Sequence, residues 1–392
     1  MRTLCRHCKR FVRRCLRFAV RRVFFPAVYS LGCLRPIDPK LALFVNDLVD
    51  WLPDNFIPLM EQLTAQGWRC VHVARRQGGR LRQYRQMFAF YLLYARARAV
   101  FHVEASFSTS CCKPRSGCDI VQLWHACGAF KKFGHSTVDL NWGPNKTVWR
   151  WFPTHRYYRY ASVSSPAIVP CYAEAYGCPE DIIRPWGVPR TDFYFQPDIA
   201  AKCRAQVLEA FPEIGGRKIV LYAPTFRGNN MRQARHDDVL DYGLLHSELG
   251  DDCALLLRPH PRARKPLPPP EHSTLPFLFD AATLPIEVLL CAADLVISDY
   301  SSLIFEYALL GRPMLFYCYD LEQYDKSRSF YYPYMDFVPG ALCWDTEDVI
   351  AGVRENLLDG KFDAARVAAF REKFMSACDG NSTARIVERV GL

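Results

Sequence analysis

The residues best suited to chemistry follow a short apolar run near residue 300. The pattern predicts a buried strand at 295–297, a polar Asp-Tyr-Ser-Ser turn at 299–302 and an amphipathic helix at 303–310. Such a turn places hydroxyls and free backbone N–H groups at the start of a helix, where an anion such as a diphosphate is stabilised. Ordinary capping of the helix by Asp and Ser gives the same local pattern. The turn alone leaves both interpretations open.

Similar polar clusters follow two other apolar runs of the second half. Thr225 and Arg227 follow one run, and Arg258 and His260 follow the next. In a parallel sheet the carboxyl ends of the strands lie along one edge, where ligands bind. Hydroxyls, guanidinium groups and an imidazole at this edge suit the oxygens of a phosphate. The alternative for His260 is a surface histidine held between two prolines.

The first half offers His125, directly after the apolar run 120–124 and shortly before Lys131 and Lys132. An imidazole titrates near neutral pH and can take a proton from an attacking hydroxyl, while the two lysines suit an anionic acceptor. A buried histidine bonded to the backbone is the alternative. Cys127 also suggests a metal or thiol-nucleophile site, but no third partner at suitable spacing supports that interpretation.

Strand-like and helix-like runs alternate along the chain, which predicts parallel sheets with helices on both faces. A Pro- and Gly-rich stretch at 184–190, interpreted as a hinge, interrupts the alternation. A chain of 392 residues is also too long for one typical core. We therefore predict two doubly wound α/β domains, at 36–195 and 196–392, facing a ligand cleft. The predicted strands are 41–45, 68–73, 99–103, 120–124, 181–184, 218–222, 253–257, 295–298 and 313–317, and an early helix is predicted at 54–66.

The net charge of +10 is confined to an N-terminal arm, residues 1–35. The arm holds ten Lys and Arg residues and no acid, so the remaining chain has forty basic residues against its 40 acidic ones. This neutral remainder gives no reason to expect nucleic-acid binding. Apolar residues recur at helical spacing in the arm, which predicts a basic amphipathic helix on an anionic membrane surface, where each cation contributes on the order of 1 kcal/mol. A solvated leader and a mitochondrial presequence are the alternatives, and no run is long enough to span a bilayer.

Seventeen cysteines are scattered along the chain without regular spacing. No secretion signal precedes them, so we predict reduced thiols in the cytosol. Cys5 and Cys8 lack a second pair at zinc-finger spacing, and no Asp-x-Asp pair stands in a metal-binding context. We therefore expect no metal and no other cofactor.

Taken in order, these motifs resemble the CDP-glycerol glycerophosphotransferase family of teichoic acid synthesis. The resemblance runs from about residue 120 to 340, is generic over 36–119 and does not include 1–35. The motifs that carry it are Trp124-His125, Lys-Lys-Phe-Gly at 131–134, Gly-x-Pro-Arg-x-Asp at 187–192, Tyr-Ala-Pro-Thr-Phe-Arg at 222–227, Arg-Pro-His-Pro at 258–261, Ser-Asp-Tyr-Ser-Ser at 298–302 and the stretch 311–324 that begins Gly-Arg-Pro.

The resemblance implies a GT-B architecture, in which the C-terminal domain binds a CDP-alcohol and the acceptor approaches from the N-terminal domain. It implies that His125 is the general base and that His260 binds the diphosphate. Glu306 would reach the ribose hydroxyls, with a solvated helix position as the alternative. Lys131 and Lys132 would bind the acceptor. The residues expected to contact the donor or surround it are Thr225, Arg227, Arg258, His260, Asp299, Ser301, Ser302 and Glu306.

The implied reaction is attack of an acceptor hydroxyl on the β-phosphorus of CDP-glycerol or CDP-ribitol, with release of CMP. Glycerol phosphate is the group expected, and the acceptor would be a lipid-linked saccharide or a growing polymer at the cytoplasmic face of the membrane. Phosphoryl transfer depends mainly on positioning and charge stabilisation. Two alternatives remain, a GT-B glycosyltransferase that uses a nucleotide sugar and a non-catalytic peripheral membrane or nucleic-acid binding protein. The sequence gives no indication of oligomeric state.

Overall fold

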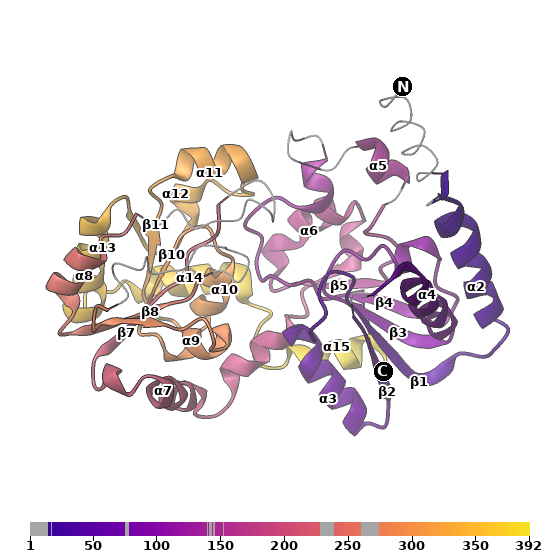
Figure 1. The fold of residues 1–392 in the computed structure, drawn as a ribbon, viewed down its shortest axis with the longest axis horizontal. Coiled ribbons are helices and arrows are strands. Elements are labelled where there is room, and N and C mark those ends of the chain that lie inside the picture. Colours follow the sequence, from indigo (N-terminus) through magenta and orange to yellow (C-terminus); the bar gives the residue numbers. More distant parts are fainter. Residues whose placement is uncertain are drawn as a thin grey trace.

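Two six-stranded sheets lie side by side, each at the centre of an α/β domain with helices packed against it (Figure 1). Every strand pair within both sheets is parallel. The predicted GT-B-like architecture of two doubly wound domains is therefore confirmed. The computed structural model describes residues 15–16, 18–74, 78–138, 140, 143, 146–151, 153–227, 239–259 and 274–392.

The first sheet has the strand order β2-β1-β3-β4-β5-β6. Its central strands form because apolar runs can be buried on both faces of a parallel sheet, and every side chain from Leu41 to Val45 is fully buried. The sequence predicts five of the six strands but not β5, which has three residues. The elements are β1 (Asp38–Val45), α3 (Ile57–Ala65), β2 (Arg69–Val73), α4 (Arg80–Tyr94), β3 (Ala97–His102), β4 (Asp119–Gln122), α5 (Lys146–Trp151), β5 (Tyr160–Ser162), α6 (Val169–Tyr176) and β6 (Ile183–Arg184).

The second sheet has the strand order β12-β11-β10-β7-β8-β9. Three of its strands, β7, β8 and β10, have the predicted bounds, while β9 and β12 have three residues each and are not predicted. The elements are α7 (Ile199–Ala210), β7 (Lys218–Tyr222), α8 (Tyr242–Leu249), β8 (Cys253–Leu257), β9 (Leu278–Asp280), α9 (Ile286–Ala292), β10 (Leu295–Ser298), α10 (Leu303–Ala308), β11 (Met314–Tyr317), α11 (Leu321–Arg328), α12 (Tyr334–Phe337), β12 (Ala341–Cys343), α13 (Thr346–Val353), α14 (Ala364–Met375) and α15 (Ser382–Val390).

In each sheet the chain order reverses between two neighbouring central strands. The reversal lies between β1 and β3 in the first sheet and between β10 and β7 in the second. Ligands of open α/β sheets bind at the carboxyl ends of strands at such switch points, because the loops there diverge and leave a crevice. The fold therefore marks the segments that follow β1 and β3 in the first sheet, and β7 and β10 in the second, as the places to look for a site.

The chain crosses between the domains twice. The predicted division near residue 195 lies in the first crossing, after β6. The second crossing returns the C-terminal helix α15 to the first domain, where Figure 1 shows it beside α3. Its Ile386, Val387 and Val390 join a core cluster that includes Phe44 and Phe101 of the first sheet. The two domains are therefore not separate in sequence, since residues after 376 complete the first one.

Asp192 fixes the start of that returning helix. Its carboxylate accepts hydrogen bonds from the backbone N–H groups of Ser382 at 2.9 Å and Thr383 at 2.8 Å. Gly187 packs against the same turn and has a left-handed backbone conformation, with φ of +91°. A Cβ at this position would overlap the Ser382 hydroxyl. The glycine and aspartate of the Gly-x-Pro-Arg-x-Asp motif thus shape the double crossing.

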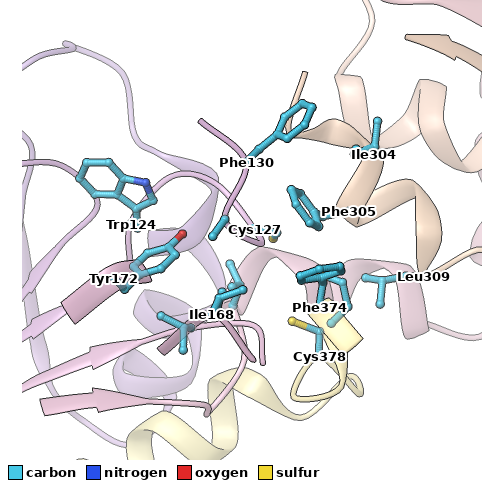
Figure 2. Close-up of a cluster of buried hydrophobic side chains, with 14 of the residues drawn as sticks. Trp124, Cys127, Phe130, Ile168, Tyr172, Ile304, Phe305, Leu309, Phe374 and Cys378 are labelled. Atoms are coloured by element: carbon cyan, nitrogen blue, oxygen red, sulfur yellow. The ribbon is translucent and has the colours of Figure 1, made fainter. Parts of the chain in front are cut away.

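A cluster of apolar side chains joins the two domains. Figure 2 shows Phe130 of the first domain beside Phe305 of α10, with their ring centroids 6.2 Å apart. Phe305 in turn stacks on Phe370 of α14 at 5.2 Å. Gly128 has a φ of +63°, and a Cβ at this position would overlap the Phe305 ring. Because this interface is apolar and closely packed, it favours one relative orientation of the domains.

The described part of the N-terminal arm is helical. It comprises the π-helical turn Val20–Phe24 followed by α2 (Phe25–Gly32), which packs on α4 through Phe25 and Tyr29. Residues 1–14 and 17 of the predicted amphipathic helix lie outside the described residues. None of the helices in the described ranges is long and apolar enough to cross a membrane. Every cysteine in the same ranges is a free thiol.

Candidate active site between the domains

A cavity of about 510 Å³ lies between the two domains at the switch point of the second sheet. The hinge segment forms one wall, and the first domain contributes Asp54, which precedes α3, and Glu61 of α3. Burial raises the pKa of the Asp54 carboxyl, and Arg190 opposes this shift. Five of the residues predicted to bind the donor line the cavity, namely Thr225, Arg258, Ser301, Ser302 and Glu306.

The serine turn before α10 offers hydroxyls to this cavity. Ser302 occupies the N-cap position of α10, but its side chain makes no capping hydrogen bond. The Ser301 hydroxyl accepts only a long bond of 3.4 Å from the backbone N–H of Leu303. Helix capping therefore does not account for the two serines. Arg258 donates to the carbonyl of Ala282 at 2.6 Å, and burial lowers the pKa of its guanidinium.

Arg227 and Asp299 do not line the cavity and instead bind each other behind it. The Arg227 guanidinium donates to Asp299 at 2.8 Å and, through two nitrogens, to Asp320 at 2.6 and 2.9 Å. Asp299 also accepts hydrogen bonds from the backbone N–H and the hydroxyl of Thr225. Burial alone would lower the pKa of Arg227, but the two carboxylates outweigh it and raise that pKa. This buried network ties the Thr225 loop to the turn that carries Ser301.

His125 lies outside the cavity lining, on the loop after β4. The preceding Trp124 adopts a left-handed conformation with φ of +58°, which turns the chain sharply at the strand end. The His125 side chain is 47% exposed, and its Nδ1 lies 3.4 Å from a carboxylate oxygen of Glu104. The same Nδ1 lies 3.1 Å from the carbonyl oxygen of Val103. A carbonyl only accepts, so Nδ1 carries a hydrogen and Nε2 is the ring nitrogen left to accept one.

Glu306 is neither solvated nor free in this structure. Its side chain is 8% exposed and forms an ion pair with Arg190 of the hinge segment. Its second oxygen accepts a hydrogen bond from the Tyr194 hydroxyl at 3.2 Å. The solvated-helix alternative is therefore wrong, and any contact with the ribose would have to share this carboxylate with Arg190. Neither Arg190 nor Glu104 is among the site residues predicted from the sequence.

The two predicted acceptor lysines lie at the domain interface. Lys131 donates from Nζ to the Tyr324 hydroxyl of α11 at 2.8 Å, and Lys132 donates its backbone N–H to the carbonyl of Ser329 at 3.0 Å. Neither residue is among those that line the cavity. Their role toward an acceptor stays a prediction. His260, the predicted diphosphate ligand, lies outside the described residues.

Two histidines of the first domain are shielded from solvent, the part-buried His155 beside the Trp124 ring and the fully buried His102 of β3. His155 lies 5.8 Å from the Trp124 ring and stacks on Tyr176 at 4.6 Å, and His102 bonds the Thr109 hydroxyl at 3.1 Å. Burial lowers the pKa of His155 to about 3 and that of His102 to about 4. Both imidazoles are therefore neutral in the folded protein at pH values where they are protonated in the unfolded chain.

This difference predicts a loss of stability in mild acid. As the pH falls below about 6.5, the unfolded state binds protons that the folded state does not, so the free energy of unfolding decreases until the folded pKa is reached. At pH 5 the effect is about 2 kcal/mol for His155. Replacing His155 with Phe should reduce the loss between pH 7 and pH 5 by about that amount. Urea unfolding at both pH values measures it, and equal losses in the variant and the native protein would contradict the prediction.

The chain belongs to the CDP-glycerol:poly(glycerophosphate) glycerophosphotransferase family, a model of which matches residues 27–392. It is 36% identical to a teichoic acid ribitol-phosphate primase of Bacillus spizizenii, over 94% of this chain and 95% of the relative. It is 32% identical to the teichoic acid ribitol-phosphate polymerase TarK of Staphylococcus aureus, over 95% of this chain and 72% of the relative. The resemblance inferred from the motifs is confirmed, and the protein is a transferase of this type.

The solved structures agree on the fold. The structure of the wall teichoic acid polymerase TagF superimposes with a TM-score of 0.77 at 20% identity, covering 100% of this chain and 96% of that one. At this identity the likeness supports the GT-B-like architecture alone.

Proposed function

We propose that this enzyme binds a CDP-alcohol in the cavity between the domains and transfers its polyol phosphate to an acceptor hydroxyl, with CMP as the leaving group. The observation that carries the proposal is the convergence of Thr225, Arg258, Ser301 and Ser302 on one cavity at the switch point of the second sheet. Hydroxyls and a guanidinium at that place suit the diphosphate of the donor. His260 would act on the same group.

His125 would serve as the general base. Its Nδ1 hydrogen faces the Val103 carbonyl and the Glu104 carboxylate, so Nε2 is the nitrogen that accepts the proton of the acceptor hydroxyl. The hydroxyl oxygen then forms a bond to the β-phosphorus, and the bond from that phosphorus to the oxygen bridging the α-phosphate breaks. The electron pair leaves with CMP. Glu104 lies where it stabilises the imidazolium formed in this step.

We propose ribitol phosphate rather than glycerol phosphate as the group transferred. The two relatives described above are named for ribitol phosphate and match this chain over nearly its whole length. This choice departs from the glycerol phosphate expected from the motifs alone. The acceptor would be the lipid-linked saccharide or growing polymer of teichoic acid synthesis.

The experiment is a nucleotide-release assay that detects both CMP and UDP, with the full-length protein and a synthetic lipid-linked disaccharide acceptor. CDP-ribitol, CDP-glycerol and UDP-sugars are offered in separate reactions. Release from CDP-ribitol alone is the expected result, and release from CDP-glycerol alone would overturn the choice of alcohol. Turnover only with a UDP-sugar would overturn the phosphotransferase proposal in favour of a glycosyltransferase. Failure of all donors to bind, measured by calorimetry, would also overturn it.

We further propose that the N-terminal helices place the enzyme on the cytoplasmic face of an anionic membrane, where such an acceptor is found. Val23 and Phe24 are exposed before α2, and Leu81, Tyr84 and Phe88 are exposed on the neighbouring helix α4. Apolar side chains in this number on two adjacent helices suit insertion into a headgroup layer.

The membrane proposal predicts a loss of vesicle binding when the apolar surface is charged. The double variant Val23→Glu, Phe24→Glu should sediment with vesicles containing anionic lipid at least about tenfold less than the native protein, because two charges enter the interface at an unfavourable free energy. The matched control is Trp344→Glu, an exposed apolar residue of the second domain. Equal sedimentation of all three proteins would contradict the prediction.

A further inference from the structure

Arg190 is the residue through which the loop of His125 and the donor side of the cavity are joined. It follows Pro189 in the hinge segment and lines the cavity. One terminal nitrogen of its guanidinium donates to the backbone carbonyl of His125 at 2.8 Å. The other forms the ion pair with Glu306 of α10. A single planar side chain thus bonds the first domain with one nitrogen and the second domain with the other.

Asn55 extends this arrangement to the residue before His125. Its side-chain amide donates to the carbonyl of Trp124 at 2.8 Å and accepts the backbone N–H of Arg190 at 3.0 Å. Asn55 is 2% exposed, so both bonds form away from solvent. The carbonyls of Trp124 and His125 are therefore both held by one pair, Asn55 and Arg190.

The other end of the connection lies on the donor side. Glu306 is in the first turn of α10, directly after Ser301 and Ser302. Tyr194 donates to the Glu306 oxygen that faces away from Arg190, which fixes the orientation of the carboxylate. Burial alone would lower the pKa of Arg190, but the Glu306 carboxylate outweighs it and raises that pKa, so the guanidinium stays charged. The path from His125 to the serine turn consists of one backbone carbonyl, one guanidinium and one carboxylate.

We propose that Arg190 is a positioning residue, which holds the backbone of His125 at a fixed place relative to the serine turn that faces the donor. Its effect on catalysis is exerted through His125, and the inference rests on the proposed role of His125 as general base. Arg190 is suited to this task because its planar fork bonds two partners at once, which the single ammonium of a lysine does not reproduce. A misplacement of about 1 Å between base and donor is enough to lower the rate by about 10²-fold.

The test is a double-mutant cycle between Arg190→Lys and His125→Ala in the full-length enzyme, with CDP-ribitol as the donor. The kcat at donor saturation and the donor Kd from calorimetry are measured for the native enzyme, both single variants and the double variant. Arg190→Lys should lower kcat by about 10²-fold and leave the donor Kd unchanged. In the His125→Ala background the same substitution should cause no further loss, because the group it positions is gone.

The control is Arg204→Lys. Arg204 of α7 also pairs with a carboxylate, Asp294, at 3.1 Å in a part-buried setting, but it lies outside the cavity lining. This variant should keep the native kcat. If Arg190→Lys does not fold, the same cycle is measured with Asn55→Ala in its place. This substitution releases the Trp124 carbonyl and leaves the ion pair between Arg190 and Glu306 in place.

The outcomes separate this inference from the proposed function. A donor Kd that weakens in parallel with kcat would show that Arg190 contacts the donor, and would overturn the positioning role. If Arg190→Lys lowers kcat by the same factor in the native and His125→Ala backgrounds, Arg190 acts independently of the base. That result would also overturn the positioning role. Near-native turnover by His125→Ala alone would overturn the role of His125 as general base, and the inference with it, while the proposed transfer would stand.

Discussion

Replacing His125 with alanine is expected to lower kcat by about 10²–10⁴-fold, the range that a general base contributes. The affinity for the CDP-alcohol should not change, because His125 is not among the residues that line the cavity. The side chain also lies at the surface of the loop, 47% exposed, so its removal leaves no buried void. A large effect on turnover with native stability and native donor binding is the signature of a residue that acts in the chemical step.

The measurement is CMP release under donor saturation, with the donor Kd and the melting temperature determined in parallel. Glu104→Gln is the companion variant, because it keeps the shape of the side chain and removes the charge that faces the imidazole. It should give a smaller loss of kcat than His125→Ala, since Val103 still fixes the hydrogen on Nδ1. A His125→Ala enzyme with native kcat, or one that loses donor affinity instead, would contradict the assignment of the base.

Replacing Arg227 with methionine is expected to destabilise the protein by about 3–5 kcal/mol. The Arg227 side chain is 8% exposed and pairs with Asp299 and Asp320, which are 3% and 17% exposed. Its removal leaves two carboxylates out of water with no cation between them. A methionine of similar length cannot replace the hydrogen bonds that Arg227 donates to the carboxylates and to the Thr225 carbonyl, so the Thr225 loop keeps only its direct bonds to Asp299.

Urea unfolding of the second domain, followed by tryptophan fluorescence and circular dichroism, measures this loss. Arg204→Met is the matched control, because Arg204 pairs with a single carboxylate and is 32% exposed. Its effect should be at most about 1 kcal/mol, since a partly solvated pair is screened. Similar losses for the two variants would show that the Arg227 network contributes no more than an ordinary surface pair.

The sequence predicted the strands of the second domain well because most of them are short, uninterrupted apolar runs. The run at 218–222 is followed by a proline after one residue, and the run at 253–257 by an arginine and a proline, so their ends are marked. The strands it missed, β5, β9 and β12, have three residues each, and so few residues carry no periodic signal. Their place at or near the edge of a sheet is set by the strands already formed.

The candidate site was predictable to the extent that strand ends determine it. Thr225, Arg258 and the serine pair follow their strands directly, and the geometry of a parallel sheet brings them together. The contacts of Arg190 could not be predicted in this way. Its partners Asn55, His125 and Glu306 lie 65 to 135 positions away along the chain, and no spacing rule relates them. Arg227 shows the converse, since its type suggested a phosphate ligand while its partners are two carboxylates.

The return of α15 to the first domain has a consequence for how the protein is made. Residues 382–390 leave the ribosome only after the whole second sheet, 218–343, has been synthesised. Until then, the face of the first sheet that carries Phe44 and Phe101 has α3 on it but lacks α15, the second helix that covers it. Part of the apolar surface of the nascent first domain is therefore uncovered until that point, and the contacts that complete it are among the longest-range in the chain. The first domain can therefore be completed only after the segments that form the second sheet have been synthesised.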